Sequence, residues 1–146
     1  EAAPAFDHLK LTAYRGDLPK DRAGRSGQLL FFWATWCGPC KAALPELLAF
    51  ERVRGVPVVA VTDESAETLD PFFKTFVDPF PERVSIDEAR RAFRAYGVSG
   101  TPTFVLVDGA GTVRSYATGY SKGKGLGIDG WRWSEMGTPA AVEASP

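Results

Sequence analysis

The sequence predicts an α/β fold in which one central mixed β-sheet is flanked by helices on both faces. Two observations predict it. Strand-like apolar runs alternate with segments of helical periodicity, and the last two strand-like runs are joined by a short glycine-containing turn. With 146 residues, 45% of them hydrophobic, the chain is long enough for one domain. We expect that domain to span residues 1–136, with its core at about 28–120 and a disordered tail at 137–146.

Five apolar runs predict the strands of this sheet. They are residues 9–14, 28–34, 56–62, 103–107 and 112–117. The first alternates apolar and polar residues, which favours an edge strand. The run 28–34 is continuously apolar and aromatic after Gln28, as expected of a strand covered on both faces. The last two runs flank Asp108-Gly109-Ala110-Gly111 and therefore predict a hairpin.

Three segments carry apolar residues spaced three and four apart and predict helices. They run from Lys41 to near Gly55, over residues 69–76 and over residues 89–96. Asp70-Pro71 is expected to begin the second helix, because proline is tolerated in a first helical turn. Asp87 is expected to cap the third helix and Gly97 to end it.

The charge balance argues against some classes of partner. The 17 basic and 18 acidic residues nearly cancel, so a surface built mainly for nucleic acid or anionic membrane is not expected. No apolar run approaches the roughly 18 to 20 residues that span a bilayer, which favours a soluble chain. The alanine-rich start, EAAPAF, lacks an initiator methionine and suits a chain cut from an exported leader or a membrane anchor.

The two cysteines of the chain, Cys37 and Cys40, form a C-x-x-C motif between a predicted strand and a predicted helix. A cysteine at a helix start meets unpaired backbone N–H groups and the positive end of the helix dipole. Such sites lower a thiol pKa from about 8.5 to between about 3.5 and 7.5, which favours the reactive thiolate. We therefore expect Cys37 to be the nucleophile and Cys40 to resolve the mixed disulfide, with Pro39 stiffening the pair.

Other uses of two cysteines fit the sequence less well. A zinc site needs about four ligands, and the chain adds only His8, which we expect to be an ordinary surface residue. Attachment of a c-type haem requires histidine at the position of Lys41. A static disulfide or two buried thiols remain as structural alternatives, although so short a loop constrains the unfolded chain little. No glycine-rich phosphate loop follows a strand, so no organic cofactor is expected. With so few ligands, no resident metal is expected either.

The segments FWATWCGPCK and YGVSGTPTFVLVD, with Pro45 between them, resemble the thioredoxin superfamily over roughly residues 28–120. The resemblance implies a thioredoxin fold in which Pro45 kinks the active-site helix. It also implies a cis bond between Thr101 and Pro102 that lies beside Cys37 and offers the backbone of Thr101 to a substrate chain. The substrate-binding residues that it implies are Trp36, Gly38, Pro39, Thr101 and Pro102.

The segment between VVAVT and YGVSGTPT is similar to that of TlpA/ResA-like thiol-disulfide reductases, which insert an extra strand and helix there. The resemblance implies an exported, bacterial and often tethered reductase of protein disulfides, for example in cytochrome c maturation, that receives electrons from a membrane protein. The Gly-Pro dipeptide matches the reducing members, whose potentials lie near −270 mV rather than the about −120 mV of DsbA. A disulfide oxidase or isomerase, and a Cu(I)-binding or scaffold module, remain open. No dimerisation segment is evident, so a monomer is expected.

The sequence departs from this pattern near the cysteines. Phe31 stands where thioredoxins often carry a buried aspartate, and Ala43 where ResA-like proteins often carry an acid. No proton acceptor for Cys40 is therefore evident. Water, Lys41, the substrate or a residue not visible from the sequence must then accept the proton. Glu46 is a further candidate, but it is expected at the solvated surface.

The end of the chain also departs, because no amphipathic helix follows Gly119. We expect a loop that lies on the domain. Trp131 and Trp133 are candidates to cover the sheet in place of a helix. Basic residues are candidates to contact an acidic partner or to form a mobile loop; they are Lys122, Lys124 and Arg132.

Overall fold

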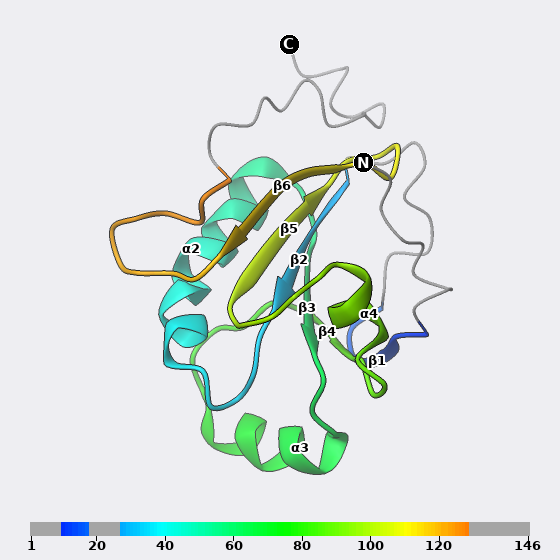
Figure 1. Ribbon diagram of the computed structural model, residues 1–146. Helices are drawn as coiled ribbons and strands as arrows, with labels where there is room; N and C mark the ends of the chain where they lie inside the picture. The colour runs from blue at the N-terminus through cyan, green and yellow to red at the C-terminus, as the bar shows by residue number, and fades with distance from the viewer. Residues whose placement is uncertain (1–9, 18–26, 129–146) are drawn as a thin grey trace.

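A computed structural model describes residues 10–17 and 27–128, which form a six-stranded sheet with helices on both faces (Figure 1). The strand order is β1-β4-β3-β2-β5-β6. The strands are β1 (Thr12–Arg15), β2 (Gln28–Phe32), β3 (Val58–Thr62), β4 (Arg83–Ile86), β5 (Thr103–Val107) and β6 (Val113–Thr118). The helices are α2 (Gly38–Arg54), α3 (Ala66–Thr75) and α4 (Arg91–Ala95).

The sheet is mixed, as the sequence predicts. β2 pairs in parallel with β3, and β3 in parallel with β4. β5 runs antiparallel to β2, with Phe31 opposite Phe104, and continues into the predicted antiparallel hairpin with β6. β1 pairs antiparallel with β4 and forms the expected edge strand. Every residue of β2, β3 and β5 is buried, which explains their nearly continuous apolar sequences.

Alternate residues of the central strand enter two separate cores. Leu29 and Phe31 pack with α2 and α3 on one face, whereas Leu30 and Phe32 pack with α4 on the other. Figure 1 shows α2 and α4 on opposite sides of the sheet. This follows from the two-residue period of a strand, which sends neighbouring side chains to opposite faces. The prediction of helices on both faces is confirmed.

The start of α3 corrects the sequence prediction. The helix begins at Ala66, four residues before the expected Asp70-Pro71 start, and Pro71 lies inside it. The hydroxyl of Ser65 accepts a hydrogen bond from the backbone N–H of Thr68 at 3.4 Å, so Ser65 is the N-cap. Helix α3 and strand β4 together form the strand and helix that the resemblance implied between β3 and residue 96.

Helix α4 is shorter than predicted, and Asp87 is not its N-cap. The helix spans Arg91–Ala95 and is preceded by Arg90 in the left-handed conformation, φ +56°. The buried carboxylate of Asp87 nevertheless accepts the backbone N–H of Phe93 at 3.0 Å. Gly97 follows the helix at φ +67°, in the role that the sequence predicts.

Helix α2 begins three residues earlier than predicted, at Gly38, and ends at the predicted Gly55. Gly55 has φ +69°, and its N–H donates to the Glu51 carbonyl at 2.9 Å. Over the described part of the chain, no helix has the length and apolar character needed to cross a membrane.

Leucine and isoleucine side chains fill the sheet face near the described end of the chain. Leu126 and Ile128 are each 2% exposed and join the core on the α2 side of the sheet. The segment after Gly119 therefore lies on the domain, as predicted. Other predictions fall outside the described residues: those for His8, Trp131, Arg132, Trp133 and the tail 137–146.

Candidate active site

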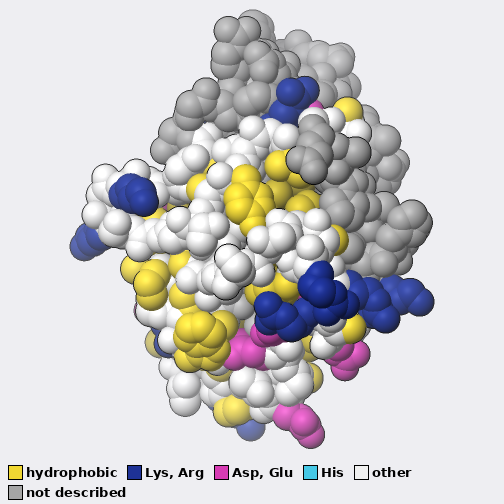
Figure 2. Space-filling view, in the orientation of Figure 1, with side chains coloured by type: hydrophobic (Ala, Val, Ile, Leu, Met, Phe, Trp, Pro, Cys, Tyr) yellow, Lys and Arg dark blue, Asp and Glu magenta, His cyan; other side chains and the backbone are white. Residues whose placement is uncertain are grey.

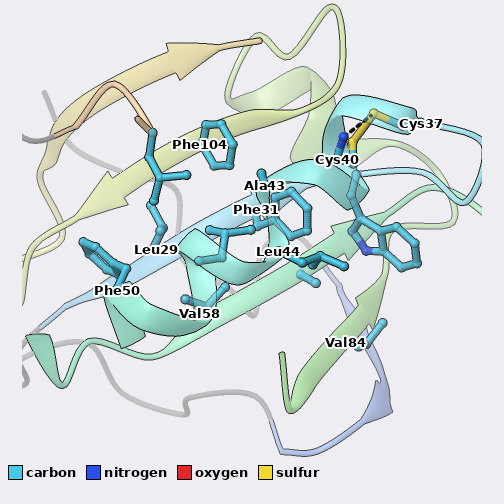
Figure 3. Close-up of a cluster of buried hydrophobic side chains, with 14 of the residues drawn as sticks. Leu29, Phe31, Cys37, Cys40, Ala43, Leu44, Phe50, Val58, Val84 and Phe104 are labelled. Atoms are coloured by element: carbon cyan, nitrogen blue, oxygen red, sulfur yellow. Dashed lines mark hydrogen bonds between the residues drawn. A yellow bond between two sulfur atoms is a disulfide. The ribbon is translucent and has the colours of Figure 1, made fainter. Parts of the chain in front are cut away.

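The two cysteines lie where β2 gives way to α2, and they form a disulfide (Figure 3). Cys37 is the N-cap of the 17-residue helix α2, and its sulfur accepts the backbone N–H of Cys40 at 3.1 Å. Gly38 and Pro39 occupy the first turn, where proline costs no hydrogen bond. The backbone thus points an N–H donor at one sulfur, the geometry expected to stabilise a thiolate at Cys37 in the reduced protein.

Both cysteines are nearly buried, while their neighbours in sequence are exposed. Cys37 is 2% exposed and Cys40 is 1% exposed, so exposure does not distinguish the attacking from the resolving sulfur. Trp36 is 76% exposed, and Gly38 and Pro39 are exposed as well. The position at the helix start, rather than solvent access, is what sets Cys37 apart.

The surroundings of the disulfide are apolar. Phe31 and Ala43, which stand where the resemblance led us to expect acids, are fully buried in the same core as both cysteines (Figure 3). The carboxylate of Glu46 accepts a hydrogen bond from the Tyr120 hydroxyl at 2.8 Å, and Glu46 is half-buried rather than at the solvated surface. This hydrogen bond raises the pKa of Tyr120 above its ordinary value. Among the described residues, no carboxylate hydrogen bonds to either cysteine.

A shallow groove of about 110 Å³ connects the cysteine loop to Thr101. The Thr101–Pro102 peptide bond is cis, and the Pro102 carbonyl accepts the N–H of Gly119 at 2.8 Å. The Thr101 hydroxyl oxygen is buried and has no hydrogen-bond partner in the described part of the protein. The groove is lined by Trp33, Ala34, Trp36, Asp63, Arg90, Phe93, Ser99, Gly100 and Thr101.

A carboxylate that the sequence prediction missed holds the loop before Cys37. Glu64 accepts the backbone N–H of Thr35 at 2.9 Å, the Thr35 hydroxyl at 2.7 Å and the Thr62 hydroxyl at 2.8 Å. Thr35 is two residues before Cys37, whereas Glu64 follows β3. Because 29 residues separate the partners, only the parallel pairing of β2 with β3 brings them together.

Aromatic packing fixes the other side of the same loop. Trp33 is 1% exposed, and its ring lies 4.8 Å from that of Phe80 and 5.5 Å from that of Phe72. Its indole nitrogen has no partner among the described residues. The structure holds no cluster of three or more potential metal ligands in residues 10–17 and 27–128.

Comparisons with known proteins agree with this geometry. Residues 1–116 match the AhpC/TSA family. Two curated relatives are called thiol-disulfide oxidoreductase ResA. The protein of Geobacillus thermodenitrificans is 35% identical over an alignment that covers 75% of this chain and 59% of that protein. The protein of Bacillus thuringiensis is 37% identical over an alignment that covers 76% of this chain and 64% of that protein. The chain thus spans about three fifths of their length. A crystal structure of a putative thiol:disulfide interchange protein DsbE from Chlorobium tepidum has a TM-score of 0.64 and 30% identity, covering 84% of this chain and 86% of that one.

Proposed function

Because this chain belongs to the AhpC/TSA family and has a thioredoxin-like fold, we propose that it is a thiol-disulfide oxidoreductase that reduces disulfides in other proteins. The observation that carries the proposal is the Cys37–Cys40 pair at the N-terminus of α2, with the backbone N–H of Cys40 directed at the Cys37 sulfur. The oxidised pair is the product of the reaction proposed here. It is formed each time the enzyme gives two electrons to a substrate.

The first step is attack by the Cys37 thiolate on one sulfur of a substrate disulfide. A bond forms between Cys37 and that sulfur, the substrate S–S bond breaks, and the other substrate sulfur leaves as a thiolate. The N-cap position supports this step because it lowers the free energy of the thiolate relative to the thiol. The departing thiolate then takes a proton from water or from Cys40.

The second step resolves the mixed disulfide. The Cys40 sulfur, after losing its proton, attacks the Cys37 sulfur and releases the second substrate sulfur as a thiolate. Phe31 and Ala43 offer no acid–base group, so water or the departing substrate thiolate is the proton acceptor that we propose. The substrate disulfide has then become two thiols, and the enzyme dithiol has become the Cys37–Cys40 disulfide.

The substrate binds, in this proposal, across the exposed rim of Trp36, Gly38 and Pro39. The backbone of Thr101 pairs with an extended substrate segment, in the way that a chain adds to a sheet edge. This binding mode is supported by the groove, whose lining includes both Trp36 and Thr101.

We also propose that the protein works as a monomer outside the bacterial cytoplasm and is reduced again by a membrane protein. This part rests on the resemblance to the TlpA/ResA branch and on the preference of such disulfide chemistry for extracytoplasmic compartments. No organic cofactor or metal is needed, since the cysteine pair carries both electrons.

Trapping of substrates tests the proposal directly. Cys40→Ser protein, expressed in its native compartment, is expected to accumulate mixed disulfides through Cys37, because the resolving sulfur is gone. Mass spectrometry identifies the adducts, and a Cys37→Ser, Cys40→Ser double variant is the control. An absence of adducts would contradict the role of Cys40.

The direction of transfer is tested separately by equilibrating the protein with glutathione buffers. A potential near −270 mV supports a reductase, whereas a value near the about −120 mV of DsbA would contradict that assignment.

A further inference from the structure

The active-site groove has a charged wall that the proposed chemistry does not use. Arg90 and Asp63 lie on this wall and form an ion pair. The side chain of Arg90 is 49% exposed and that of Asp63 is 27% exposed, so a ligand in the groove meets the guanidinium more readily than the carboxylate. Of the groove residues in the described part of the chain, Arg90 is the one with a basic side chain.

The fold holds Arg90 in a fixed orientation. Its backbone has φ +56°, which is uncommon for a residue other than glycine. The conformation is held on both sides: the N–H of Arg90 donates to the Asp87 carbonyl at 3.0 Å, and its carbonyl accepts the N–H of Arg94 at 2.9 Å. The guanidinium carbon lies 4.6 Å from the centroid of the Phe93 ring, which is also in the groove. The cation is therefore oriented before any substrate arrives.

Two other carboxylates close to Arg90 in the fold, those of Asp87 and Glu64, already have hydrogen-bond partners of their own. The carboxylate of Asp87 is buried and accepts the N–H of Phe93, while both oxygens of Glu64 are occupied by Thr35 and Thr62. Arginine carries five N–H donors, and the ion pair with Asp63 uses one of them. Donors remain for a second carboxylate.

Further basic residues lie along α4 beside the groove. Arg91 and Arg94 are exposed, and Figure 2 shows basic side chains gathered on the face that carries this helix. Charges of this kind attract an acidic segment toward the groove without contacting it there.

We propose that Arg90 is a specificity residue that binds a carboxylate side chain lying beside the target cysteine of the substrate. The partner is an extended protein segment with aspartate or glutamate next to its disulfide, its apolar groups resting on the exposed ring of Trp36. This inference rests on the proposed function and names the substrate class of that same site. Specificity then comes from hydrogen bonds between a substrate carboxylate and the remaining donors of a guanidinium that the fold has already oriented.

The test compares two disulfide-linked peptides that differ only in glutamate or glutamine next to the cysteine. The reduced protein is expected to reduce the glutamate peptide about threefold faster in kcat/KM, the size typical of a partly exposed ion pair. The ratio is expected to approach one at about 1 M salt, where screening is strong. Arg90→Gln is expected to remove the preference and Arg90→Lys to keep part of it.

Two further variants separate contact from general attraction. Asp63→Asn frees the guanidinium from its present partner and is expected to increase the glutamate preference. Arg91→Gln is the matched control, since it removes the same charge from the next residue, which does not line the groove, and its glutamate preference should fall clearly less than that of Arg90→Gln. Circular dichroism and thermal unfolding establish that each variant is folded.

The possible failures are distinguishable. Equal rates for the two peptides in the wild type, or an equal loss of preference in Arg91→Gln and Arg90→Gln, would overturn the inference and leave the reductase function intact. Failure of the reduced wild type to reduce either peptide would overturn the proposed function, and the inference with it.

Discussion

Replacing Glu64 by alanine should weaken both the fold and the reaction. The carboxylate accepts three hydrogen bonds, two of them from Thr35 in the loop before Cys37. The site is half-buried, so we assign about 1 kcal/mol to each hydrogen bond, near the average net value in proteins. The sum, about 3 kcal/mol, corresponds to a melting temperature lower by about 6 to 12 °C in a domain of this size.

The same change should slow disulfide reduction, because the loop that places Trp36 and Cys37 loses its anchor. A displacement of 1 Å at a reacting group can cost up to about 100-fold in rate. Insulin reduction measures this effect, and differential scanning calorimetry of the same samples measures stability.

Glu64→Gln is the matched control. Its amide oxygen still accepts the N–H of Thr35 and the Thr62 hydroxyl, and its amide nitrogen can donate to the Thr35 hydroxyl. We expect this variant to melt within about 4 °C of the wild type, equivalent to about 1 kcal/mol. An alanine variant with wild-type melting temperature and rate would refute the reasoning. A glutamine variant as impaired as alanine would show that charge, rather than loop anchoring, is what matters.

Three other changes test the packing around the site. Tyr120→Phe removes the hydrogen bond to Glu46 and should cost about 0.5 to 1 kcal/mol at neutral pH. Folding raises the pKa of Tyr120, so the stability that this hydrogen bond contributes is present below about pH 10 and is lost as the pH rises through the folded-state pKa. The unfolding free energies of wild type and variant should therefore converge in alkaline urea titrations. Leu126→Ala removes a buried side chain and should lower the free energy of unfolding by about 2 to 5 kcal/mol in urea titrations at pH 7. Lys124 is exposed, so Lys124→Ala should lower it by less than about 0.5 kcal/mol. Equal effects of the two changes would contradict the packing of this segment. Pro71→Ala restores a helical N–H inside α3 and should raise the melting temperature above that of the wild type. A melting temperature below that of the wild type would show that Pro71 does not destabilise the helix.

The central sheet was predictable because its inner strands are buried on both faces, which leaves long apolar runs in the sequence. The cysteine position was predictable for a local reason, since strand, turn and helix signals meet within a few residues. Features that depend on distant pairing were not. Nothing near Glu64 in the sequence indicates Thr35 as its partner. Leu126 and Ile128 lie in a glycine-rich segment without helical or strand periodicity, so their burial leaves no sequence signal. Asp70-Pro71 predicts too late a start for α3, because the Ser65 hydroxyl caps the helix earlier and Pro71 is accommodated inside it.

The near-complete burial of the Cys37–Cys40 disulfide has a kinetic consequence. A thiolate must reach a disulfide sulfur along the S–S axis, and here solvent touches only 2% of one cysteine and 1% of the other. We therefore expect small thiols in the surrounding medium to exchange slowly with the pair. If the proposed function holds, this burial would shield the disulfide from the ambient thiol pool and favour exchange with proteins whose surface fits the exposed rim around it.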